Sequence, residues 1–173
     1  MDTITIDGLT FRVSVKHDEG MGAPWKEHDG HGIVSEWTAR GKAPGERVLA
    51  HDGASYRYYD YQGTLARAAK DGWGIAPDEA AGLTKRQITA RAVDSDYERM
   101  RAWCADEWDW VYVCVTLLDT DGAPTKERES CGGIESDAGE YLDEIARELA
   151  GEIIARVGTK DALCVRIRPE VAA

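Results

Sequence analysis

The stretch Trp108-Asp-Trp-Val-Tyr-Val-Cys-Val-Thr-Leu-Leu118 is rich in β-branched and aromatic residues and contains nothing that breaks a strand. Read with a period of two, it has two apolar faces. One face carries Val111, Val113, Val115 and Leu117, and the other carries Trp108, Trp110, Tyr112, Cys114, Thr116 and Leu118. A strand that is apolar on both faces belongs in the middle of a sheet that is covered on each side. We therefore expect this run to be the central strand of the fold.

The segments around this run predict helices and a turn. Before it, Thr84-Lys-Arg-Gln87 has the form of a capping box, and the apolar spacing that follows predicts a helix to about Ala105. After it, Asp119-Thr-Asp-Gly122 predicts a tight turn into a polar second strand. The last predicted helix opens at Asp137, which has Glu140 three residues later, and ends at Gly158.

The amino-terminal part predicts two hairpins and a short helix. Residues 3–16 alternate apolar and polar side chains about an Asp7-Gly8 turn, and residues 47–59 form a second hairpin. Residues 17–32 are rich in glycine and charge, so we expect a long loop there. Residues 61–70 predict a short helix that stops at the following glycine.

The order of these elements is that of an α+β protein, with an antiparallel β-sheet, β-hairpins and about three α-helices packed on it. The length of 173 residues and the hydrophobic content of 43% favour a single domain over residues 1–173. If the chain has two lobes, the connector at residues 74–82 is where we expect them to divide. Residues 163–168 predict a short edge strand.

Cysteine usage and hydropathy indicate a cytoplasmic protein. No apolar run approaches the roughly 20 residues that cross a bilayer, and the first residues lack a basic region followed by an apolar one. The cysteines form no C-x-x-C pair, so we expect reduced, partly buried thiols. They are Cys104, Cys114, Cys131 and Cys164.

The net charge of −11 comes from one stretch of the chain. Between Ala102 and Glu152, three basic residues stand against fourteen acidic ones, whereas the remainder has eighteen of each. Phosphates are neutralised by Lys and Arg, so this distribution argues against direct binding to nucleic acid or to an anionic membrane. It favours a basic protein surface as the partner, with plain solubility as the alternative.

Aromatic side chains lie among these carboxylates. Trp103, Trp108 and Trp110 alternate with acidic residues, which is typical of a surface that grips cationic side chains, although core packing is the alternative. Carboxylates three or four residues apart on a helix recur about every 5–6 Å, broadly like the phosphates of one DNA strand. The candidate partner-binding residues are Asp106, Glu107, Trp108, Asp109, Asp137, Glu140, Asp143, Glu144, Glu148 and Glu152.

The loop Glu27-His-Asp-Gly-His31 is the one cluster that resembles a set of metal ligands. His28 and His31 lie three residues apart among carboxylates, and imidazole with carboxylate can hold zinc or non-haem iron. The spacing matches no closed structural site, and a solvated turn is the simpler interpretation. No phosphate-binding glycine motif or nucleophile elbow is present, and we expect no cofactor.

Four segments carry a resemblance to a known family. They are Met-Gly-Ala-Pro-Trp-Lys-Glu-His-Asp-Gly-His-Gly (21–32), Pro-Gly-Glu-Arg-Val-Leu (44–49), Arg-Ala-Trp-Cys-Ala-Asp-Glu-Trp (101–108) and Gly-Ile-Glu-Ser (133–136). With them the chain resembles a family of small acidic proteins encoded by bacteriophages and prophages. The resemblance implies a phage accessory protein in a bacterial host cytoplasm, and it implies no activity, cofactor or catalytic residue.

Two kinds of function follow from these features. The first is a binding protein whose acidic half occupies a nucleic-acid-binding or otherwise basic surface of a host protein, as an inhibitor of restriction or CRISPR machinery would. The second is a small metal-dependent enzyme that uses the loop of His28 and His31. A phage metabolic or assembly accessory, whose acidity serves only solubility, is the third alternative.

Overall fold

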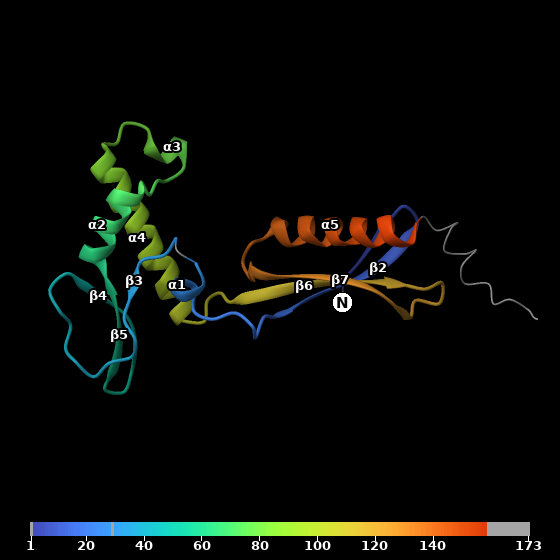
Figure 1. The fold of residues 1–173 in the computed structure, drawn as a ribbon, viewed down its shortest axis with the longest axis horizontal. Coiled ribbons are helices and arrows are strands. Elements are labelled where there is room, and N and C mark those ends of the chain that lie inside the picture. Colours follow the sequence, from blue (N-terminus) through green and yellow to red (C-terminus); the bar gives the residue numbers. More distant parts are fainter. Residues whose placement is uncertain (1, 29, 159–173) are drawn as a thin grey trace, which may run out of the picture. The chain divides into compact units, whose positions relative to one another are not determined.

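The computed structural model describes residues 2–28 and 30–158, and they divide between two compact units. Unit 1 comprises residues 1–21 and 109–173, and unit 2 comprises residues 22–108. Both units contain helices and antiparallel strands (Figure 1), which confirms the α+β class. The boundaries fall at each end of unit 2, whereas the connector at residues 74–82, where the sequence placed a division, lies inside it.

Unit 1 is a four-stranded antiparallel sheet with strand order β1-β2-β6-β7. The β1–β2 hairpin turns at Asp7 and Gly8, which both have positive φ, as a two-residue hairpin turn of this kind requires. The helix α5 packs along β6 and β7 (Figure 1). The bounds are β1 (Asp2–Ile6), β2 (Leu9–His17), β6 (Trp110–Leu118), β7 (Pro124–Glu135) and α5 (Glu140–Val157).

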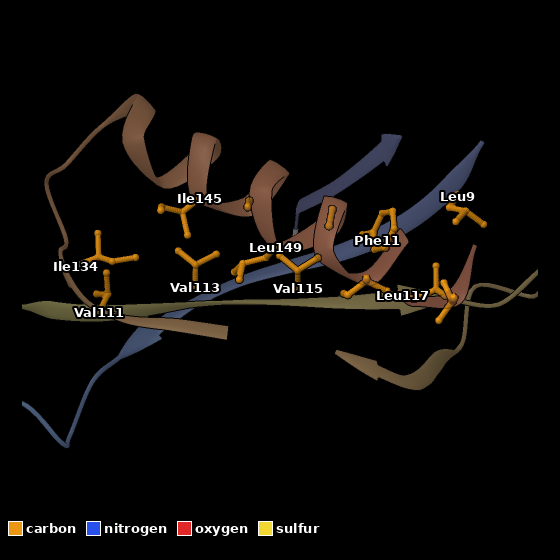
Figure 2. Close-up of a cluster of buried hydrophobic side chains, with 13 residues drawn as sticks. Leu9, Phe11, Val111, Val113, Val115, Leu117, Ile134, Ile145 and Leu149 are labelled. Atoms are coloured by element: carbon orange, nitrogen blue, oxygen red, sulfur yellow. The ribbon is translucent and has the colours of Figure 1, made fainter. Parts of the chain in front are cut away.

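The core of unit 1 lies between α5 and the valine face of β6 (Figure 2). Val113, Val115 and Leu117 are fully buried there, and Ile153 of α5 is fully buried against the same cluster. β6 pairs with β2 on one side and with β7 on the other. The prediction of a central strand is therefore confirmed.

The other face of β6 differs from the prediction, because no helix covers it among the described residues of unit 1. Tyr112, Cys114 and Thr116 are only half-buried. Arg12 and Arg128 flank Thr116 in register on the neighbouring strands. The apolar stems of such long side chains can shield part of a sheet while their charged ends stay in water.

Unit 2 combines a three-stranded antiparallel sheet, of order β3-β5-β4, with helices. The capping box predicted at Thr84 and Gln87 is present at the start of α4. α2 begins after Asp60, whose side chain accepts from Gly63 N, and ends at Gly72 in the left-handed region, as predicted. The bounds are α1 (Pro24–Glu27), β3 (Ile33–Val34), β4 (Glu46–Asp52), β5 (Ser55–Asp60), α2 (Tyr61–Asp71), α3 (Pro77–Ala80) and α4 (Lys85–Cys104).

Three local predictions need correction or comment. The expected loop at 17–32 contains the short helix α1, because Pro24 is well suited to a first helical turn. α5 begins at Glu140 after Gly139, whose φ is 60°, so Asp137 is not its cap. Gly158 ends α5 as predicted. The predicted edge strand at 163–168 lies outside the described residues.

Candidate functional site

The outer side of α5 carries a row of exposed carboxylates. The helix turns its apolar residues toward the sheet, and this leaves the acidic ones in solvent. From Glu140 to Glu152 the row spans about 18 Å at 1.5 Å per residue. It consists of Glu140, Asp143, Glu144, Glu148 and Glu152, which we call the α5 acidic face.

None of these five carboxylates forms an ion pair within the described residues, although the spacings of Asp143 with Arg147 and of Glu152 with Arg156 would allow two such pairs on the helix. Arg156 does not pair with Glu152; its guanidinium instead contacts Glu127 and Glu129 of β7. These contacts raise the pKa of Arg156, Glu129 being the strongest cause. Asp143 has no ion pair with Arg147 either. The α5 acidic face therefore takes part in none of the ion pairs of the described residues, although the exposed Arg147 stands among its carboxylates.

Tyr141 belongs to this surface, and the sequence reasoning missed it. It stands four residues before Ile145, a spacing that is typical of the apolar stripe of a helix, yet 51% of it is exposed. The stripe begins one residue later, with the partly buried Leu142. Glu144 and Glu148 follow Tyr141 at helical spacing, so the aromatic ring stands among carboxylates. Tyrosine in such a setting is a common anchor of protein interfaces.

Asp109 and Asp137, the other candidates in unit 1, are less suited to partner binding. Asp109 Oδ2 lies 2.6 Å from His17 Nδ1, and its Oδ1 accepts from Trp110 N at 2.7 Å. Both oxygens of the Asp109 carboxylate thus already have a partner within unit 1. Asp137 is exposed in the turn before α5 and takes part in an interaction of its own, so it is set apart from the helical row.

The remaining candidates, Asp106, Glu107 and Trp108, belong to unit 2. Asp106 and Glu107 are exposed just beyond α4. Trp108 is only 3% exposed. Its Nε1 donates to the carbonyl oxygen of Arg99 at 3.0 Å, and the guanidinium of Arg99 lies 3.9 Å from the centroid of the Trp108 ring. Trp110 in unit 1 is equally buried. Trp108 and Trp110 are therefore packed in the core, which was the alternative interpretation, and Trp108 is not part of the candidate surface.

The histidine loop is organised by a carboxylate far away in the sequence. His31 Nδ1 lies 2.8 Å from Asp96 Oδ1 of α4, and the two side chains are only 18% and 9% exposed. Asp96 Oδ2 accepts from Gly32 N at 2.8 Å and from the Tyr59 hydroxyl at 2.6 Å. Burial, followed by the hydrogen bond to Asp96, raises the pKa of Tyr59, so its hydroxyl remains a donor.

His28 is exposed. Its ring centroid lies 6.4 Å from that of His31. Within residues 2–28 and 30–158, no three His, Cys, Asp or Glu side chains are grouped so that they could hold a metal ion. The two histidines differ in exposure, since His28 is exposed and the side chain of His31 is only 18% exposed.

Comparison with protein-family models, curated proteins and solved structures finds no match to this chain. Among the described residues, no helix is both long and apolar enough to span a membrane. Cys104, Cys114 and Cys131 are free thiols, and burial raises the pKa of Cys104. Cys164 lies outside the described part of the chain.

Proposed function

We propose that this chain is a protein-binding protein whose α5 acidic face occupies a cationic surface on its partner. In this proposal the chain is a phage accessory protein in the host cytoplasm. The partner is a nucleic-acid-binding protein of the bacterial host, such as a component of restriction or CRISPR defence, and binding inhibits it. The observation that carries the proposal is the row of exposed carboxylates that form no ion pair within the described residues.

Charge segregation within unit 1 supports this choice of surface. Arg12 and Arg128 register with Thr116, and Lys16 with Tyr112, so these cations share the sheet face that α5 does not cover. Arg156 forms ion pairs with two glutamates of β7. Arg147 is thus the one exposed cation that stands among the α5 carboxylates. A concentrated field of one sign speeds encounter with a surface of the opposite sign.

The geometry of a helix also suits a nucleic-acid-binding cleft. Glu140, Glu144, Glu148 and Glu152 follow one another at intervals of four residues, or about 6 Å along the axis. A cleft lined with Arg and Lys for a phosphate backbone can pair with such a row. Tyr141 supplies an aromatic anchor at one end, where it can pack against an arginine.

A charge-neutralised variant tests the proposal. In the test variant, Glu144→Gln, Glu148→Gln and Glu152→Gln remove three charges from α5 without changing side-chain size. In the control variant, Asp2→Asn, Glu19→Gln and Asp121→Asn remove three exposed charges elsewhere in the same unit. Both variants should give the circular dichroism spectrum of the wild type.

The measurement is capture of binding proteins from host lysate at low and at high salt. We expect wild type and control to retain the same nucleic-acid-binding protein at low salt, to lose it at high salt, and the α5 variant not to retain it. If the α5 variant retains the same proteins as wild type, the carboxylates are only solvated and the proposal fails. Capture that falls equally in both variants would show a general effect of net charge and would also contradict it.

A further inference from the structure

A pocket of about 610 Å³ lies in unit 2 beside the anchored imidazole of His31. Its lining includes the apolar side chains of Trp73 and Ile75, which stand between α2 and α3 in the sequence. It also includes Arg91, Ser95 and Asp96 of α4. Apolar side chains together with a few polar groups are the usual composition of a site for a small molecule.

The hydrogen bonds around His31 determine which of its nitrogens can contact a ligand. Asp96 takes up Nδ1 and also accepts from Gly32 N and from the Tyr59 hydroxyl. The carbonyl oxygen of His31 accepts from Arg67 Nη1 at 3.4 Å. The ring is thus held by its side chain and by its backbone, and Nε2 is the nitrogen that Asp96 does not hold. A carboxylate on Nδ1 also fixes the orientation of the ring.

The charged groups of the pocket favour an anion. Arg91 donates from Nη1 to the carbonyl oxygen of Glu79 at 3.4 Å and forms no ion pair within the described residues. Its other N–H groups are therefore available to a bound carboxylate or phosphate. The carboxylate of Asp96 is already bound by three groups, namely the His31 ring, Gly32 N and the Tyr59 hydroxyl. The other acidic side chain in the lining is Glu79, which is exposed.

We propose that this pocket binds a small organic anion, a phosphate or carboxylate on an apolar body, through Arg91 and His31 Nε2. Ser95 offers a hydroxyl to the same anionic group, and Trp73 packs against the apolar body. The simpler alternative is that Asp96 only fastens the loop to α4. The hydrogen bonds of Asp96 to Gly32 N and to the Tyr59 hydroxyl would be enough to hold the loop on α4. That alternative gives no role to Arg91 or to His31 Nε2.

The test is a titration of the full chain with three probes, followed by the imidazole and indole signals of His31 and Trp73 in NMR spectra. The probes are phenyl phosphate, benzoate and, as the neutral counterpart, benzyl alcohol. We expect both signals to shift in a saturable way with at least one anion at concentrations up to about 10 mM. Tighter binding of phenyl phosphate would identify a phosphate site, and tighter binding of benzoate a carboxylate site.

Two variants and two matched controls assign the effect. Arg91→Gln and His31→Gln should each weaken binding of the preferred anion at least about tenfold, or by about 1.4 kcal/mol. His28→Gln, in the same loop, and Arg86→Gln, on the same helix, should leave binding unchanged, since both residues are exposed and outside this lining. Arg91→Gln keeps the test informative if the loop does not tolerate the change at His31.

The proposal is overturned if no anion shifts the two signals, or if benzyl alcohol binds as tightly as the anions. It is also overturned if Arg91→Gln binds the preferred anion as tightly as Arg86→Gln does. The pocket would then have no ligand-binding role, and Asp96 would only hold the loop on α4. These outcomes leave the proposed role of α5 unaffected, because that role depends on unit 1 alone.

Discussion

Replacing Ile153 with alanine should lower the stability of unit 1 by about 3–4 kcal/mol. The side chain is fully buried between α5 and the sheet. The change removes three carbon groups, each worth about 0.8 kcal/mol when buried, and leaves a cavity that adds to the loss. Ile153→Val removes one carbon group and should cost about 1 kcal/mol, so the two variants give a graded series.

Hydrogen exchange measures this loss where it occurs. The protection free energy of the Val113 and Val115 amides in β6 should fall by the predicted amount. Tyr141→Ala on the same helix is the control and should change it by less than about 0.5 kcal/mol, because the ring is exposed. A loss below about 1 kcal/mol for Ile153→Ala would refute the packing of α5 on β6.

Two further predictions concern unit 2. A Cβ at Gly32 would overlap the Tyr59 hydroxyl group. Gly32→Ala should therefore lower the free energy of unfolding by about 1–3 kcal/mol, measured by thermal unfolding. A Cβ at Gly30 would meet no atom within 4 Å, so Gly30→Ala should be nearly neutral. The hydrogen bond with Arg40 lowers the pKa of Glu46 to about 2. The stability from this pair is therefore present above about pH 4.5 and is lost as the pH falls toward 2. Glu46→Gln should remove this part of the pH dependence of the free energy of unfolding, measured in acid titrations.

Local patterns in the sequence were sufficient for most of the elements. The alternation about Asp7-Gly8 and the capping box at Thr84 act within a few residues, so both could be read directly. The pairing of β2 with β6 could not be predicted from local patterns. Its partners, such as Arg12 and Thr116, are separated in the sequence by all the residues of unit 2. Apolar side chains on both faces of β6 suggested a sheet covered twice, but no helix covers the second face among the described residues of unit 1.

The candidate sites show the same limit. The exposed carboxylates of α5 followed from helical periodicity, but the preference of Arg156 for β7 did not, because it depends on how the helix lies on the sheet. The contact of His31 with Asp96 spans 65 residues, so nothing near the loop indicated it. The buried position of Trp108 likewise depends on its packing against Arg99.

Competition between this chain and DNA for one partner tests whether the α5 acidic face occupies a nucleic-acid-binding surface. The partner is the nucleic-acid-binding protein that the wild-type chain captures, purified and assayed for DNA binding by fluorescence anisotropy. We predict that the wild-type chain displaces labelled DNA, that added salt weakens this effect, and that the variant neutralised at Glu144, Glu148 and Glu152 does not displace it. A ternary complex, in which the partner holds both DNA and the wild-type chain, would contradict the account.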